Sequence, residues 1–165
     1  MATNHFFQLS KILIGNIAAD GGMSTTLTER FGETVIGSAN FTGDDTTETL
    51  FNVEEHDDAV ESIAVAGNLR FVFSTHNASP TALMNAFGGT IVAGVWHAPA
   101  AEVDIEVSVR VEMKTGLFLE ITRTKLKARP AFTFAKDSIG QIDLVGTVLA
   151  PTKAGESKYR VGVIA

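Results

Sequence analysis

The sequence predicts a mainly β protein, a β-sandwich or barrel with one short flanking α-helix and a long extended arm. The clearest evidence is a stretch from Val103 to Met113, in which apolar and polar residues alternate without a break over eleven positions. This period of two is typical of a strand with one buried face and one wet face. A turn at Lys114–Gly116 and a second strand from Leu117 to about Ala128 follow, so the two strands are expected to form a hairpin.

Only one segment reads as a helix. Ser79 is a good N-cap, Pro80 suits the first helical position, and Gly88 suits the end of a helix. Three apolar side chains follow one another at helical spacing, which predicts that this short helix lies on a sheet; they are Leu83, Met84 and Phe87.

The remaining strands are shorter, and the whole chain, residues 1–165, is expected to form one domain. Further strands are predicted at Leu9–Ile14, Val60–Ala66, Leu69–Thr75, Ile91–Trp96, Ala131–Ala135, Ile142–Leu149 and Lys158–Ile164. Gly67-Asn68 has the composition of a two-residue hairpin turn, which would pair the second of these strands with the third.

The second strand of the long hairpin changes character half-way. Strict alternation would place its apolar residues on the same face as a basic run; the residues of that run are Arg123, Lys125, Lys127 and Arg129. One interpretation is an edge strand whose charges block aggregation. The other is a contact for an acidic surface of another subunit.

The segment from Thr34 to Asp58 is the candidate arm, because it is polar, rich in Gly, Thr and Asp, and too long for an ordinary loop. It is expected either to be disordered alone or to order against another copy. Thr34–Phe41 and Leu50–Val53 are candidates to pair as a hairpin. Between Arg30 and Arg70 there is no Lys or Arg and there are nine carboxylates, namely Glu33, Asp44, Asp45, Glu48, Glu54, Glu55, Asp57, Asp58 and Glu61.

Composition excludes several function classes. The 13 Lys and Arg against 19 Asp and Glu give a net charge of −6, which argues against general binding to a phosphate backbone. The absence of cysteine excludes disulfides and thiolate chemistry. The chain contains no nucleophile elbow or P-loop, and its four histidines are scattered. We therefore expect no enzyme, no metal and no cofactor, and, because no apolar run is long enough, no membrane anchor.

The order of these features resembles the tail tube (major tail) proteins of long-tailed bacteriophages. The resemblance covers most of the chain and lies in a series of segments: the turn Gly15–Gly22, the acidic arm, the strand pair around Gly67-Asn68, the helix closing on Phe87–Thr90, the hairpin 103–128 and the closing segment Leu149–Glu156.

This resemblance implies a subunit that forms six-membered rings, which stack into a hollow tube through which DNA leaves the particle. It implies the virion tail as the location, the host cytoplasm during assembly, and tape-measure, tail-terminator and distal tail proteins as further partners. The tube of a contractile injection system shares this fold.

Two groups of residues are candidates for assembly. The polar face of the long hairpin is the candidate channel lining, with Asp104, Glu106, Ser108, Glu112, Glu120 and Thr122, because an acidic wall repels phosphates; Arg110 interrupts this face. The arm and the basic run are the candidates for ring stacking or subunit contact, with Asp44, Asp45, Glu48, Glu54, Glu55, Asp57, Asp58, Arg123, Lys125, Lys127 and Arg129.

Three other classes compete with this interpretation. A capsid decoration protein or other virion structural protein would have the same charge-poor β composition. A β-barrel that binds a small ligand predicts a stable monomer with an apolar cavity. A hydrolase is the weakest alternative, since no residue is marked for catalysis.

Overall fold

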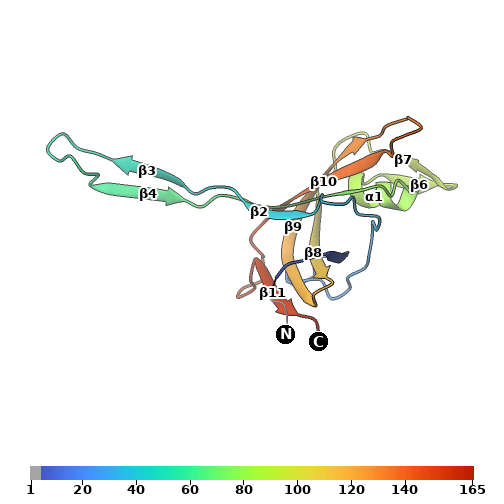
Figure 1. Cartoon of the computed structure of the whole chain (residues 1–165), viewed down its shortest axis with the longest axis horizontal. Helices are drawn as coiled ribbons and strands as arrows, with labels where there is room; N and C mark the ends of the chain where they lie inside the picture. The colour runs from blue at the N-terminus through green and yellow to red at the C-terminus, as the bar shows by residue number, and fades with distance from the viewer. Residues whose placement is uncertain (1–4) are drawn as a thin grey trace.

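The computed structural model describes residues 5–165 and shows a mainly β chain with one helix, as the sequence predicts (Figure 1). Within these residues the elements are β1 (Leu9–Asn16), β2 (Asn40–Gly43), β3 (Thr47–Phe51), β4 (Glu61–Val65), β5 (Leu69–Thr75), α1 (Pro80–Phe87), β6 (Thr90–Val92), β7 (Val95–His97), β8 (Ile105–Met113), β9 (Leu117–Ala131), β10 (Gln141–Val148) and β11 (Tyr159–Val163).

Seven strands form the main antiparallel sheet of the body, in the order β1-β8-β9-β10-β5-β2, and β11 also pairs with β9. The fifteen-residue strand β9 organises this sheet, because β8 lies along one of its edges while β10 and β11 share the other. Beyond this edge of β9 the sheet therefore has two branches: one continues through β10 and β5 to β2, and the other is β11 alone. A space is left between β2 and β11.

The hairpin of β8 and β9 supplies much of the core. Val107, Val109 and Val111 are at most 3% exposed, as the alternation predicts, and they pack with buried residues of β1, β5, β9 and β10. The β1–β8 and β2–β5 pairs bring together segments that are far apart in the sequence.

A register shift inside this hairpin corrects the predicted placement of the basic run. Val107 lies opposite Thr124 but Val109 lies opposite Ile121, so β9 has one extra residue at Thr122-Arg123. A β-bulge of this kind reverses which face the following side chains occupy. As a result, Thr124 and Leu126 continue the buried face, and the basic run lies on the opposite face, beside Glu106 of β8 and Asp104, which precedes β8.

Helix α1 begins and ends where the sequence predicts. The Ser79 hydroxyl accepts a hydrogen bond from the Ala82 N–H, and Gly88 closes the helix with a φ of 79°. The buried positions are Ala82 and Ala86, with Leu83 and Phe87 partly buried against the core. The third predicted packing residue, Met84, is exposed instead.

Two predicted strands are wrong. The segment Ile91–Trp96 is not one strand but the small hairpin β6–β7, because Ala93 and Gly94 both have a positive φ and reverse the chain. The segment Ala131–Ala135 is not a separate strand, because β9 continues through Ala131 and residues 132–140 form the connection to β10.

The arm is a β-hairpin, although its pairing differs from the predicted one. Strand β3 pairs with β4, whereas β2, which was expected to pair with the region after it, pairs with β5 of the body. Gly67-Asn68 is not a hairpin turn between β4 and β5 but the point where the chain returns to the body. There the Asp44 N–H donates to the Asn68 carbonyl at 2.8 Å, so both ends of the arm lie side by side.

Candidate functional site

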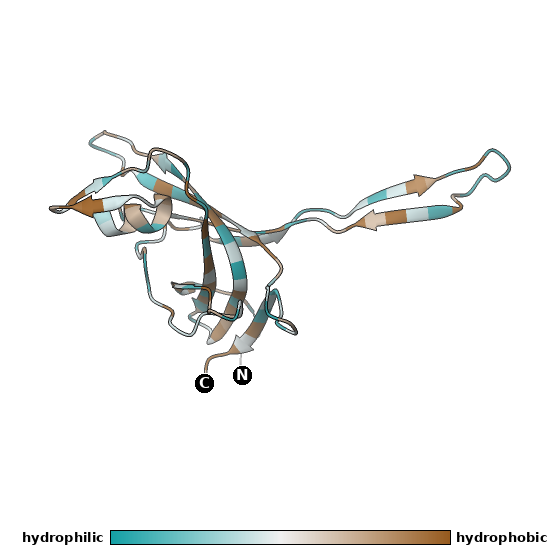
Figure 2. Cartoon of the chain, turned by 180° about the vertical axis from the view of Figure 1, so that it is seen from behind, coloured by the Kyte–Doolittle hydropathy of each residue, from teal (hydrophilic) through white to brown (hydrophobic). Residues whose placement is uncertain are grey.

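The arm, which we define from the structure as residues 44–68, projects far from the body (Figure 1). Every residue of β3 and β4 is exposed, although these strands carry apolar side chains (Figure 2). Six large apolar residues of the arm are at least 40% exposed: Leu50, Phe51, Val53, Val60, Ile63 and Val65. An isolated two-stranded hairpin is marginally stable in water, and free strand edges are templates for pairing with another chain.

The arm also separates the charges of the chain. It contains eight of the 19 carboxylates and none of the 13 Lys and Arg, so its formal charge is −8. The rest of the chain then has 13 cations against 11 carboxylates, a net charge of +2. Five of the arm's carboxylates gather toward its tip, at Glu54, Glu55, Asp57, Asp58 and Glu61. Arm and body are therefore opposite in sign.

Three of the six predicted channel residues are buried inside the subunit, which corrects their assignment. Ser108, Glu120 and Thr122 are 0%, 6% and 3% exposed. The Ser108 hydroxyl accepts a hydrogen bond from the Ser24 N–H, and the Thr122 hydroxyl donates to the Ser157 carbonyl. The segments before β11 and after β1 thus cover part of the face that the alternation assigns to solvent.

Glu120 is held in a network of ions under this cover. Its carboxylate accepts hydrogen bonds from Arg110, at 3.1 Å, and from Arg160 of β11. Arg110 also contacts Glu112 at 2.9 Å and lies over the Phe118 ring. The partners of Arg110 are therefore in its own chain, and the network joins β8, β9 and β11.

The basic run has acidic partners within the same subunit. Arg123 donates two hydrogen bonds to Glu106, Lys125 contacts Asp104 at 2.9 Å, and Lys127 contacts both Asp104 and Glu102. Hydrogen bonds from Lys125 and Lys127 lower the pKa of the Asp104 carboxyl. Arg129 contacts Asp143 at 3.0 Å. None of the four cations therefore needs a carboxylate from another copy, and Asp104 and Glu106 belong to a face of balanced charge.

Asp143 predicts a measurable pH dependence of stability. A hydrogen bond from Ser74, followed by one from Arg129, holds the pKa of this carboxyl below its ordinary value of 3.8. Because the folded pKa is the lower one, the stabilisation is present above the unfolded value and is lost as the pH falls through the folded value. We expect Asp143→Asn to reduce the acid-side slope of the unfolding free energy below about pH 5.

This slope is measured by urea denaturation at a series of pH values. Asp137→Asn is the matched control, because Asp137 forms no ion pair with any of residues 5–165. Equal slopes for wild type and Asp143→Asn would contradict the assigned role of Asp143.

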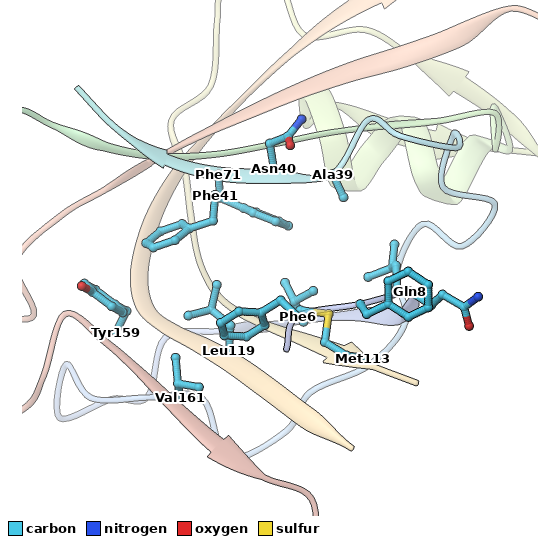
Figure 3. A pocket seen from close by; sticks show the side chains of 13 residues that line it. Phe6, Gln8, Ala39, Asn40, Phe41, Phe71, Met113, Leu119, Tyr159 and Val161 are labelled. Carbon is cyan, nitrogen blue, oxygen red and sulfur yellow. The ribbon is translucent and has the colours of Figure 1, made fainter. Parts of the chain in front are cut away.

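The body has an apolar cleft where the sheet divides (Figure 3). Its volume is about 430 Å³, and its walls come from the segment Phe6–Leu9 and from β2, β5, β8, β9 and β11. At one side Phe41 of β2 and Tyr159 of β11 meet edge to face, with ring centroids 5.2 Å apart. Among residues 5–165, no charged residue lines this cleft. We call it the β2–β11 cleft.

Sequence reasoning did not identify the β2–β11 cleft. Its walls come from segments more than a hundred residues apart, which the pairings of β1 with β8, of β2 with β5 and of β11 with the first half of β9 bring together. The exposure of the apolar residues of the arm was not predicted either, because the polar residues around them made the segment read as polar throughout.

Residues 5–165 contain neither a candidate metal site nor a membrane-spanning helix. In residues 5–165 no group of three or more His, Asp or Glu side chains is arranged to hold a metal ion. In the same range, no helix has the length and apolar character needed to cross a membrane. In comparisons with known proteins, no protein-family model and no curated protein matches the chain.

Proposed function

We propose that this chain is a structural virion subunit, which forms stacked hexameric rings that make a hollow phage tail tube for the passage of DNA. The observation that carries the proposal is the arm, an acidic hairpin with exposed apolar side chains, whose strands β3 and β4 pair only with each other within residues 5–165. A protein with such an element is built to associate, since large exposed apolar surfaces mark interaction sites. In this proposal the arm makes the contact between rings.

The edges of the main sheet provide the second contact. In the described chain β2 has a strand partner only on the β5 side, and β1 has β8 on one side and a single bridge, to Thr28, on the other. Pairing of these edges between neighbours would close a ring and leave no exposed edge. The tube of a contractile injection system would use the same contacts.

The channel wall that we propose has paired charges and is not uniformly acidic. Asp104 and Glu106 remain on the surface of the β8–β9 face, and Lys125 and Arg123 neutralise them. A wall built from this face has paired charges, so it offers DNA no strip of free cations to bind. Low friction then comes from charge balance, whereas the sequence suggested an acidic repulsive wall.

Sedimentation velocity of the purified chain over a range of concentrations tests this function. We expect a species of six subunits and larger multiples of it, because each ring must close before it stacks. A single monomeric species at every concentration would contradict the proposal.

A further inference from the structure

We propose that the β2–β11 cleft is the receptor for the arm of a second copy, with Phe51 and Ile63 of the arm as the inserted side chains. The inference rests on the proposed function, in that it names the surface that accepts the ring-to-ring contact. It replaces the basic run as the receiving surface, because the cations of that run are paired internally.

One face of the arm is suited to an apolar cleft. In the β3–β4 register Thr49 lies opposite Ile63, and Phe51 lies opposite Glu61. Side chains of directly opposed residues share a face of a hairpin, so Phe51 and Ile63 are diagonal neighbours on one side. They are 47% and 52% exposed, and Val65 continues the same face.

The cleft has the size and lining to accept them. An engineered apolar cavity of about 150 Å³ binds benzene, so 430 Å³ accommodates a phenyl ring together with an aliphatic side chain. Side chains on its walls are themselves incompletely buried, including Phe6, Phe7 and Val161, which are more than half exposed. Docking of the arm would remove apolar surface from water on both partners.

Charge favours docking of the arm on the body of another copy. The arm has a formal charge of −8 and the rest of the chain a net charge of +2, so the two are opposite in sign. Among residues 5–165 no cation lines the cleft itself, so this attraction comes from the body as a whole and the cleft receives the apolar face of the arm.

Two neighbouring hollows are less suitable for the apolar face of the arm, because charged residues line them. The hollow between β1 and residues 33–37 contains Lys11, Glu29, Glu33 and Lys114, and the hollow beside α1 contains Glu102 and Lys127. The β2–β11 cleft has no charged residue in its lining among residues 5–165. The arm extends away from the body, so its own cleft is out of reach and the occupant must come from another copy (Figure 1).

Cysteine cross-linking tests this contact directly, because the chain contains no cysteine of its own. One preparation carries Ile63→Cys on the arm, and a second, with a tag of different size, carries Val161→Cys in the cleft. The two are mixed and oxidised, and the mixed disulfide is quantified on a non-reducing gel. The control is Ala64→Cys, because Ala64 is adjacent to Ile63 and faces the opposite side of the hairpin.

We expect the mixed disulfide to form with Ile63→Cys at least fivefold more than with Ala64→Cys. Adding Phe7→Asp to the cleft partner, which puts a carboxylate into the apolar lining, should reduce it severalfold, whereas Val92→Asp on the β6–β7 hairpin should not. If the wild-type chain forms rings or tubes but the Ile63→Cys and Val161→Cys chains do not cross-link, the docking site is overturned and the proposed function stands. The same conclusion follows if the Ala64→Cys control cross-links equally well.

Two further outcomes have distinct meanings. A wild-type chain that stays monomeric in sedimentation would overturn both the docking site and the proposed function. A lipophilic small molecule that copurifies with the wild-type chain and blocks the Ile63→Cys cross-link would overturn the docking site in favour of a ligand cavity. Native mass spectrometry of the purified protein detects such a molecule as added mass.

Discussion

A chain in which two glycines replace residues 45–67 is expected to fold normally and to lose all ring stacking. None of the core residues lies in the arm, so removing it takes nothing from the buried cluster. The two ends already meet, since Gly43 pairs with Leu69 and Asp44 donates to Asn68. The short connection then becomes an ordinary turn between β2 and β5. Thermal unfolding tests whether the shortened chain folds normally, and electron microscopy tests whether its rings still stack.

A second variant keeps the length of the arm and changes only its apolar face. Phe51→Ser with Ile63→Ser should also abolish stacking, whereas Val92→Ser with Val95→Ser, at equally exposed positions of the β6–β7 hairpin, should not. Tubes of normal length from the shortened chain would show that the arm is dispensable for assembly.

Removal of the Glu120 carboxylate is expected to cause a large loss of stability. Glu120 is 6% exposed and accepts hydrogen bonds from Arg110 and Arg160. Breaking a buried ion pair by removing one partner typically destabilises by about 3–5 kcal/mol. Glu112 still contacts Arg110 after the change, so we expect Glu120→Ala to lose about 3 kcal/mol, the lower end of that range.

Glu106→Ala is the matched control for this measurement. Glu106 lies on the same face of the hairpin, but it is exposed and contacts only Arg123 among the described ion pairs. Exposed ion pairs contribute about 0–1 kcal/mol, so we expect a loss in that range. Both values come from guanidinium denaturation. Similar losses for the two variants would contradict the structural role of Glu120.

Local signals in the sequence predicted the elements that depend on local chemistry. The β5 boundaries and the capped start of α1 agree with the structure, because alternation, the Ser79 cap and Pro80 act within a few residues. The apolar face of β8 was predicted for the same reason. Its polar face was only partly predicted, since the segments that cover Ser108 and Thr122 come from both ends of the chain.

Non-local pairing produced the errors. One extra residue at Thr122-Arg123 moves the basic run to the other face of β9, and no period-two pattern reveals where a bulge lies. The two strands of the arm carry mixed faces, so their register could not be read from hydrophobicity. The β2–β11 cleft depends on pairings between distant segments, which a single sequence does not specify.

Negative-stain electron microscopy of the wild-type chain at high concentration tests directly whether the chain forms stacked six-membered rings. We expect hollow tubes of uniform width, with six-fold rings in end view. Compact particles without a lumen, or trimers without stacking, would contradict a tail tube and would favour another virion structural role.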